Sequence, residues 1–439
     1  MVNRLNVTIP RSGHLAIASV VILIILHFLI LRVTPPGFYV DEALTGAHVT
    51  SMLTNGTDAN GTTWPLFSLS AGGGYTTAVY LYPLVGWASI FGTGEYALRA
   101  FSTFITILAI LITGLGVRVW THNNKGMYLT WIIGLIMPWP WLSGSVAWDP
   151  IMLPLFVALA WLGFSNLMRH KNHTMLWLMI VGASLLLGAY VYPPFRASGP
   201  LLLVVGVVYA YLRSRINIKH ILLTSLPLAL LALPLLNFLL QPSAMGRTTQ
   251  LSVFISGSLI AGLAQMIINY VLILNPVTLF ITGDPNLRHS TGMFGMLGGV
   301  GLIGIIGLIA QWRKPRSQLR PLHAPLLIAS VGVIIATLGS ALTNEGQPHF
   351  LRATGAWPFF IIIISIGWQR ILLMRWRYIY GAIGLCSVLT VTYIADLTLA
   401  YPSRSANAFD SDVRSQIRSG NTVQYPDSAI NYYRNQYGK

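Results

Sequence analysis

The chain has 439 residues, of which 54% are hydrophobic and only 9% are Asp, Glu, Lys or Arg. Soluble domains contain about 25% charged residues, so this composition excludes an ordinary soluble globular protein. The net charge of +16 would suit nucleic acid, but the Lys and Arg residues recur in short clusters between apolar runs, as in the cytoplasmic loops of membrane proteins. The sequence therefore predicts a polytopic membrane protein whose basic residues face the membrane surface, with no nucleic acid partner.

The apolar runs predict about eleven transmembrane helices, because a run of about 20 apolar residues crosses a bilayer. The first run follows Arg4 and Arg11, but it is too long for a signal peptide and no small-residue cleavage site follows it. The predicted spans are 14–32, 98–117, 127–142, 151–168, 174–191, 198–212, 221–240, 292–311, 324–341, 355–368 and 378–395.

The distribution of charge predicts the orientation. Alternate short loops hold most of the 27 Lys and Arg residues, which predicts a cytoplasmic N-terminus and an outer C-terminus. All 11 acidic residues then lie on the outer side. Acidic residues contribute little to orientation. Solvation explains the four that lie in the tail, and the other seven suggest chemistry at the outer face. We expect an integral protein of the cytoplasmic (plasma) membrane with its active site outside.

Two long outer segments, 33–97 and 241–291, interrupt the series of spans. Loops of this length in a compact fold are usually functional. Within the first, the stretch from Tyr75 to Phe91 is apolar and aromatic with Gly and Pro, which favours a helix lying in the membrane interface. We divide the chain into a catalytic transmembrane module at 1–291, C-terminal transmembrane helices at 292–395 and a short outer tail at 396–439.

Three carboxylates are candidate catalytic residues. Asp41 and Glu42 directly follow the first span, where a carboxylate pair is costly unless it binds something. Asp41 either caps the helix predicted from Ala43 or acts in catalysis, and the two roles are compatible. Asp149 precedes Pro150 at the outer mouth of the fourth span, where it would also suit a helix cap. The topology brings Asp41 and Asp149 to one membrane level, as general-base catalysis or orientation of an acceptor requires.

Two outer clusters combine histidine with arginine. Arg288 and His289 lie in a turn-rich segment before the eighth span, and His349 and Arg352 lie in a similar segment before the tenth. The guanidinium offers a planar fork of donors that matches phosphate. The clusters predict an anion site, with an arginine that only snorkels at the membrane edge as the alternative for Arg288.

Three glycines inside the eighth predicted span imitate a nucleotide-binding motif. Gly299, Gly301 and Gly304 have a suitable spacing, but no strand precedes them. Small residues in a span allow close approach of helices, so we interpret these glycines as packing residues.

A set of motifs occurs in order along the chain: Pro36 to Ala43, Gly61 to Leu66, Phe91-Gly92 with Leu98-Arg99, Gly283 to Ser290 and Gly346 to Arg352. Together they resemble the prokaryotic phospholipid-carrier-dependent glycosyltransferases of the GT-C superfamily, which are related to the protein O-mannosyltransferases and the lipid A aminoarabinose transferase. The resemblance covers about residues 14 to 370. It implies an all-α polytopic GT-C fold with about 11 transmembrane helices and interfacial helices in the first outer loop.

The resemblance also implies an activity. Such an enzyme moves a sugar from a polyprenyl-phosphate donor to a protein, lipid or glycan acceptor on the outer face, inverting the sugar carbon, as mannosyltransferases of this kind do. Asp41 matches the first-loop aspartate that serves as general base or orients the acceptor, with Glu42 as its companion. Asp149 matches a second outer carboxylate of the aminoarabinose transferase.

The same resemblance assigns the donor site. Arg288 and His289 would hold the lipid phosphate, with His349 and Arg352 as further phosphate contacts. No organic cofactor is implied, and a divalent cation bridging the two aspartates to the phosphate is compatible with their oxygen ligands. The chain lacks the large lumenal insertion of eukaryotic protein mannosyltransferases and, within residues 65 to 83, the lysine of the aminoarabinose enzyme.

Other functions use the same residues differently. A transporter or flippase of an anionic lipid or solute would need the same cations, but it should place ionisable residues near the midplane and contain an internal repeat. The sequence has almost no such residues and no such repeat. A non-catalytic scaffold for envelope assembly predicts that Asp41→Asn leaves function intact. The tyrosine-rich tail either packs against the outer loops or contacts the acceptor.

Overall fold

The computed structural model describes residues 11–70, 73–170, 172–242, 244, 249–255, 257–310, 322–410, 413, 416, 419 and 426–437. Part of the charge pattern used to predict the orientation lies outside these residues, namely Arg4, Lys171, Arg313, Lys314, Arg316, Arg320 and Asp412.

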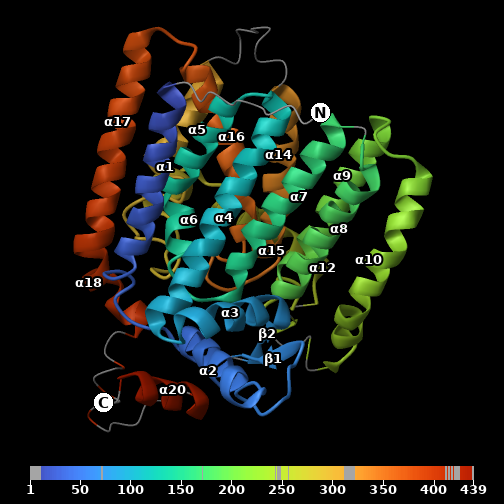
Figure 1. Ribbon diagram of the computed structural model, residues 1–439, viewed down its shortest axis with the longest axis vertical. Coiled ribbons are helices and arrows are strands. Elements are labelled where there is room, and N and C mark those ends of the chain that lie inside the picture. The colour runs from blue at the N-terminus through green and yellow to red at the C-terminus, as the bar shows by residue number, and fades with distance from the viewer. Residues whose placement is uncertain are drawn as a thin grey trace, which may run out of the picture.

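Long apolar helices form the body of the protein (Figure 1). Every range predicted to span the membrane contains a helix. In chain order these are α1 (Arg11–Ile30), α4 (Glu95–Thr121), α5 (Asn124–Ile136) with α6 (Pro138–Ser143), α7 (Met152–Arg169), α8 (Thr174–Val191), α9 (Phe195–Leu212), α10 (Ile218–Leu239), α13 (Gly298–Ala310), α14 (His323–Ala336) with α15 (Leu338–Ala341), α16 (Trp357–Ile371) and α17 (Trp376–Ala395).

Helix length supports fewer membrane crossings than the apolar runs predicted. Among the described residues, eight helices are long and apolar enough to cross a membrane. α5 and α13 have 13 residues each, and a helix of that length extends only about 20 Å against a hydrocarbon core of about 30 Å. The count of eleven crossings and the orientation therefore stay predictions.

Apolar side chains cover the outside of the bundle. Along α10, Leu222, Leu226, Leu230 and Leu233 are each more than half exposed. So large an exposed apolar surface is unfavourable in water and favourable against lipid tails. The chain is an integral membrane protein, as its composition predicted.

One hydrophobic core connects the helices and reaches from Val20 in α1 to Tyr433 near the C-terminus. α4 packs extensively against α7 at its centre, and α16 packs against α13, α14 and α5. The packing role predicted for the α13 glycines is confirmed, because a side chain on Gly367 of α16 would overlap the carbonyl oxygen of Gly304. The division of the chain at residue 291 stays a prediction.

The first long loop, 33–97, which was predicted to lie outside, forms a layer across one end of the bundle (Figure 1). It contains α2 (Val40–Asn55), the antiparallel pair β1 (Phe67–Leu69) and β2 (Tyr75–Thr77), and α3 (Ala78–Phe91), which crosses the direction of the long helices. α3 coincides with the helix predicted to lie in the interface. The second long segment, 241–291, contains α12 (Leu259–Ile273) and the π-helical turn η3 (Thr278–Thr282).

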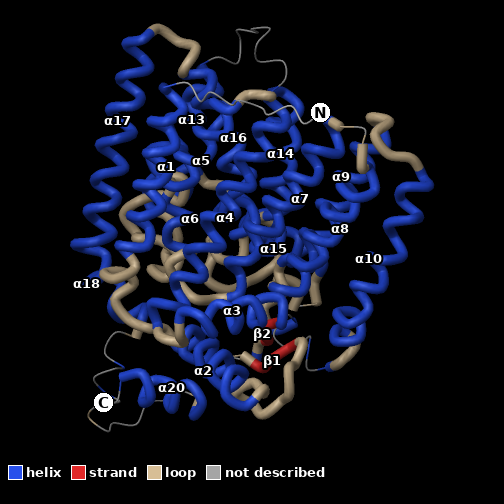
Figure 2. Tube along the Cα trace, viewed as in Figure 1, coloured by secondary structure: helices blue, strands red, loops and turns tan. Residues whose placement is uncertain are grey.

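The two ends of the bundle differ in their loops. The loop joining α9 to α10 and the loop joining α16 to α17 lie at the end opposite α2 and α3 (Figure 2). Those loops contain Arg213, Arg215 and Arg375, whereas Asp41, Glu42 and their neighbours lie in the α2 layer. The observed separation of basic and acidic loops agrees with the charge asymmetry used to predict the orientation.

The tail packs against the α2 layer. α17 continues through η6 (Asp396–Ala400), α18 (Tyr401–Ser405) and η7 (Ala406–Phe409), and α20 (Asp427–Tyr437) then packs against α2. The hydroxyl of Tyr432 donates to the carbonyl of Thr93, and that of Tyr433 donates to the carbonyl of Phe38. Of the two roles considered for the tail, packing against the outer loops is the one observed.

A substitution at Gly46 tests this docking. An alanine Cβ at this α2 position would overlap the ring of Tyr432, and overpacking of this kind costs about 1 to 3 kcal/mol. We expect Gly46→Ala to loosen α20, so that trypsin cleaves after Arg434 about 5 to 150-fold faster. Gly86→Ala in α3 is the matched control, because nothing lies within 4 Å of its added Cβ. Equal cleavage rates in the two variants would contradict the docking.

Candidate functional site

Asp41 lies in the first turn of α2. The helix begins at Val40 after an extended Tyr39, so Asp41 is the second helical residue and the helix-cap role considered for it is wrong. A carboxylate in the first turn is stabilised by the helix dipole. Successive helical residues point in directions about 100° apart. Asp41 and Glu42 therefore face different surroundings: Asp41 borders a cavity, whereas Glu42 is fully buried.

Glu42 is the centre of a buried hydrogen-bond network. Arg99 in α4 donates from Nε to Glu42 Oε1 at 2.9 Å and from Nη2 to Oε2 at 2.7 Å. The backbone N–H of Ala147 donates to Oε1 at 2.8 Å, and that of Tyr39 donates to Oε2 at 3.1 Å. Arg99 also pairs with Glu95 at 2.6 Å. Glu42 therefore joins the start of α2, the start of α4 and the loop before Asp149.

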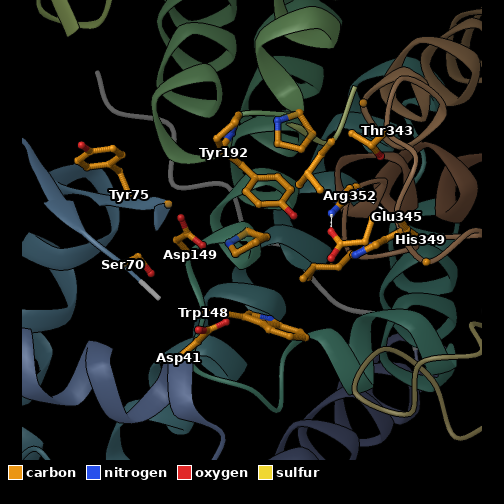
Figure 3. A pocket seen from close by; sticks show the side chains of 18 of the residues that line it. Asp41, Ser70, Tyr75, Trp148, Asp149, Tyr192, Thr343, Glu345, His349 and Arg352 are labelled. Atoms are coloured by element: carbon orange, nitrogen blue, oxygen red, sulfur yellow. Dashed lines mark hydrogen bonds and ion pairs between the residues drawn. The ribbon is translucent and has the colours of Figure 1, made fainter. Parts of the chain in front are cut away.

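Asp149 begins the single 3-10 turn η2 (Asp149–Ile151), which leads directly into α7. The residue before this turn is Trp148, so the cap role considered for Asp149 is wrong as well. Because Glu42 accepts a hydrogen bond from Ala147, the segment that contains Asp149 is tied to the segment that contains Asp41. The two carboxylates, predicted to share one membrane level, border the same cavity (Figure 3).

The cavity has a volume of about 1020 Å³, at the upper end of the range for small-molecule sites, about 300 to 1,000 Å³. Figure 3 shows Asp41 and Asp149 apart from Arg352 and His349, with the cavity between them. Six of the seven predicted site residues line it, all except Glu42: Asp41, Asp149, Arg288, His289, His349 and Arg352.

Arg288 is held inside the cavity wall by Tyr39. Its guanidinium carbon lies 4.1 Å from the centroid of the Tyr39 ring, a cation–π contact. Burial and the nearby charge of Asp41 raise the pKa of Tyr39 to about 12, so its ring stays neutral. Arg288 is therefore anchored beside the Asp41 segment, and the alternative of an arginine that only snorkels does not describe its position.

His289 and His349 lie side by side, with ring centroids 4.8 Å apart. Nδ1 of His289 lies 2.8 Å from the buried carboxylate of Asp284. Burial, together with the charges of His289, Arg352 and Arg288, lowers the pKa of His349 well below its ordinary value. His349 is therefore a neutral imidazole at physiological pH, able to offer a lone pair.

Arg352 is buried and forms an ion pair with the exposed carboxylate of Glu345, which also lines the cavity (Figure 3). Glu345 and Asp284 lie in or directly beside the two His/Arg clusters of the sequence, but neither was predicted as a site residue. Their presence beside His and Arg in those clusters was the available signal. Arg288, His289, His349 and Arg352 together form what we call the cation wall of the cavity. The carboxylates of Glu345 and Asp284 lie beside these residues and partly neutralise their charge.

Arg196 is a site residue that the sequence analysis missed. It lies in the first turn of α9, lines the cavity and interacts electrostatically with Asp149. The aromatic residues Tyr75, Trp148 and Tyr192 also line the cavity (Figure 3). A charged residue at the start of an apolar helix, directly after Pro193-Pro194-Phe195, was the signal in the sequence.

Comparisons with known proteins identify the fold. No family model and no curated protein sequence matches the chain. Among solved structures, ArnT from Cupriavidus metallidurans bound to undecaprenyl phosphate matches with a TM-score of 0.60 at 14% identity, over 98% of this chain and 86% of ArnT. The archaeal oligosaccharyltransferase AglB from Archaeoglobus fulgidus, in complex with an inhibitory peptide and a dolichol-phosphate, has a TM-score of 0.48 at 15% identity, over 98% of this chain and 60% of AglB.

The match to ArnT extends over nearly the whole chain. It agrees with the resemblance seen in the sequence motifs. The chain therefore has the fold of ArnT, as the resemblance to the GT-C superfamily predicted.

Proposed function

We propose that the protein is an inverting glycosyltransferase that moves a sugar from a polyprenyl-phosphate donor to an acceptor on the outer face of the plasma membrane. The observation that carries this proposal is the cavity, which is bordered by Asp41 and Asp149 and also by Arg288 and Arg352. An acceptor nucleophile needs a base and a leaving phosphate needs cations. The fold shared with ArnT, crystallised with undecaprenyl phosphate, supports a lipid-linked donor.

The reaction is a single displacement. The acceptor oxygen attacks the anomeric carbon, the bond from that carbon to the phosphate oxygen breaks, and polyprenyl phosphate leaves with the bonding electrons. Asp41 takes the proton of the acceptor, and Asp149 orients the acceptor and stabilises positive charge on the sugar. Arg288 and the neighbouring histidines stabilise the charge on the leaving phosphate, so no strong general acid is required.

Glu42 acts as a positioning residue in this mechanism. Its carboxylate is buried against Arg99 and accepts a backbone hydrogen bond from the segment before Asp149. Both carboxylate oxygens are therefore occupied by donors from the protein. Glu42 keeps Asp41 and Asp149 at a fixed separation, although it does not line the cavity.

The resemblance in the sequence motifs to protein O-mannosyltransferases favours mannose as the sugar, and the acceptor is a protein, lipid or glycan. A divalent cation bridging Asp41 and Asp149 fits their carboxylate oxygens. The competing function is transport of an anionic lipid or solute, and the same purified protein in liposomes tests both.

The decisive variant is Asp41→Asn. Loss of a general base lowers turnover by about 10² to 10⁴-fold, and the amide keeps the shape of the side chain. We expect normal folding and a loss of this size in the release of radiolabelled sugar from a panel of polyprenyl-phosphate sugars, to water or to added acceptors. Asp427→Asn, an exposed outer carboxylate outside the cavity, should keep wild-type turnover. Wild-type turnover in Asp41→Asn, or movement of donor across the bilayer without transfer, would contradict the proposal.

Arg288 should act mainly on the donor. Removing a hydrogen bond to a charged group costs about 1.5 to 3 kcal/mol, so Arg288→Ala should weaken donor affinity by about 10 to 100-fold, and Arg288→Lys should recover part of it. The measurement is the KM for the donor beside kcat, in detergent-purified protein. Arg375→Ala, exposed at the opposite end of the bundle, is the control. An unchanged donor KM in Arg288→Ala would remove this residue from the donor site.

Glu42→Gln separates positioning from catalysis. Breaking one partner of a buried ion pair costs about 3 to 5 kcal/mol, and Glu95 remains beside Arg99 to reduce that loss. We expect a lower melting temperature together with a lower kcat, whereas Asp41→Asn lowers kcat alone. In the double variant Glu42→Gln/Arg99→Met, the loss of stability should be smaller than the sum of the single losses. Additive losses would show that the pair does not act as a unit.

A further inference from the structure

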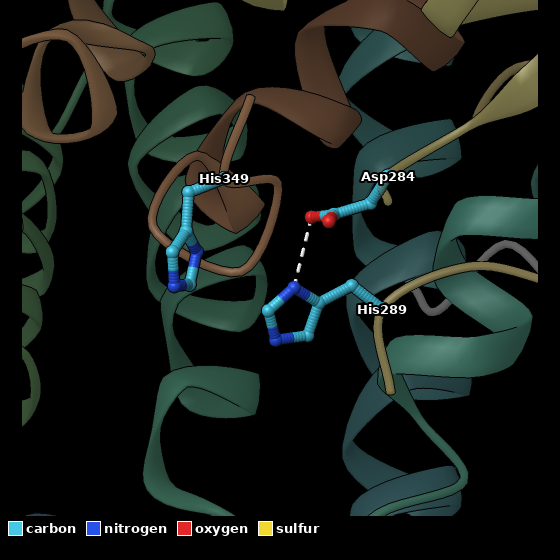
Figure 4. A group of neighbouring side chains, drawn as sticks. All are labelled: Asp284, His289 and His349. Atoms are coloured by element: carbon cyan, nitrogen blue, oxygen red, sulfur yellow. Dashed lines mark hydrogen bonds and ion pairs between the residues drawn. The ribbon is translucent and has the colours of Figure 1, made fainter. Parts of the chain in front are cut away.

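Asp284, His289 and His349 are neighbouring side chains (Figure 4), and the two histidines line the cavity. Asp284 and His289 belong to the loop before α13, and His349 belongs to the loop that follows α15. One ligand atom from each residue, a carboxylate oxygen or an imidazole nitrogen, lies within 4.8 Å of the other two. The cluster is distinct from the carboxylates Asp41 and Asp149.

The types of atom in the cluster suit a particular class of ion. Two imidazole nitrogens and one carboxylate oxygen are ligands preferred by zinc and the divalent first-row transition metals. Magnesium and calcium prefer ligand sets made of oxygen alone. Tetrahedral zinc, with bonds of about 2.0 to 2.2 Å, places its ligand atoms about 3.4 Å apart. In the structure, His289 Nδ1 lies 2.8 Å from Asp284, and all three ligand atoms lie within 4.8 Å of one another. These distances lie on either side of about 3.4 Å, so small side-chain rotations are enough to enclose an ion.

A second observation points to a ligand. Nδ1 of His349 is buried, and among the described residues no hydrogen-bond partner contacts it. An unsatisfied buried polar atom costs about 1 to 3 kcal/mol, and a native structure retains few of them. Coordination to a metal ion would satisfy this nitrogen.

The rest of the cluster is held by hydrogen bonds from the backbone. The N–H of Phe350 donates to Asp284 Oδ2 at 2.9 Å, and the N–H of Asn286 donates to Oδ1 at 2.8 Å. The carbonyl of His349 accepts a bond from Ser340 Oγ at 3.0 Å. The contact from Phe350 to Asp284 ties the two loops together beside the three ligands. Such surrounding bonds orient the ligands of metal sites.

We propose that Asp284, His289 and His349 bind one divalent transition-metal ion of the zinc class, with its open coordination position facing the cavity. His289 and Arg352 line that cavity, so an anion in it can contact both the ion and the arginines. A divalent ion beside Arg288 and Arg352 needs anions as neighbours, and Asp284 supplies one. The phosphate of the lipid donor supplies the other, and this last step rests on the proposed function.

Metal binding is measured first, with no sugar donor present. The full-length protein in detergent is stripped with a chelator and titrated with Co²⁺, while visible d–d absorption and elemental analysis report the stoichiometry. We expect one ion per chain, and an affinity lowered at least about tenfold in His349→Gln and in Asp284→Asn. His170→Gln, at an exposed histidine, should bind as the wild type does. No binding by the wild type, or equal binding by His349→Gln, overturns the site.

A second titration tests the role of the open position. Undecaprenyl phosphate without a sugar is added to the Co²⁺-loaded protein, and we expect the absorption spectrum to shift. Metal binding without this shift overturns contact with phosphate and leaves the metal site. Sugar transfer by a wild-type protein that binds no Co²⁺ overturns the metal site and leaves the transferase. Metal binding with no transfer from any donor overturns the transferase alone.

Discussion

The arrangement of the cavity depends on the buried ion pair between Glu42 and Arg99. Neither side chain is exposed to solvent, and an unpaired charge at that depth would be strongly destabilising. The pair is stable because backbone groups of two segments complete its hydrogen bonds: Tyr39 and Ala147 donate to Glu42, and the carbonyl of Pro35 accepts from Arg99. Because Asp41 directly precedes Glu42 in the same helical turn, fixing Glu42 also fixes the direction of Asp41.

A second contact brings the two walls of the cavity together. Arg288 lies over the ring of Tyr39, so a cation from the loop before α13 touches the residue that precedes α2. Tyr39 donates its backbone N–H to Glu42 and offers its ring to Arg288. One aromatic residue thus connects the carboxylate network with the cation wall. The distance from Asp41 to the cations is then set by packing within the protein and needs no ligand to establish it.

The sequence predicted the positions of the helices and the grouping of the charged residues, but it did not predict the exact helix starts or the number of membrane crossings. Apolar runs located a helix at every predicted span, and charge asymmetry brought Asp41, Asp149 and the two His/Arg clusters to one face. Helix starts were missed by a residue or more, because backbone conformation at Tyr39 and Trp148 decides them and both positions read as ordinary aromatic residues. The crossing number cannot be read from composition where helices such as α13 are shorter than the bilayer.

The sequence could not predict the role of site residues whose position depends on partners far away in the chain. The burial of Glu42 follows from Arg99, which is far along the chain, and only the folded structure brings the two together. Arg196 reaches the cavity because α9 begins at its edge. Asp284 was visible as a turn residue, but its contact with Phe350 requires two loops separated by α13, α14 and α15. Residue types identified the chemistry, and tertiary contacts decided which of those residues enter the cavity.

The position of the cavity relative to lipid is consistent with a donor that has an apolar tail. Phe238 and Leu239 at the end of α10 form part of its lining, and the same helix exposes Leu233 and Leu236. A single helix thus contacts the cavity on one side and the surrounding lipid on the other. In the proposed function, the phosphate head group of the donor would enter the cavity while its apolar tail stayed in lipid, so binding would remove only the head group from water. The affinity for such a donor then depends mainly on the cations that replace the water around its phosphate.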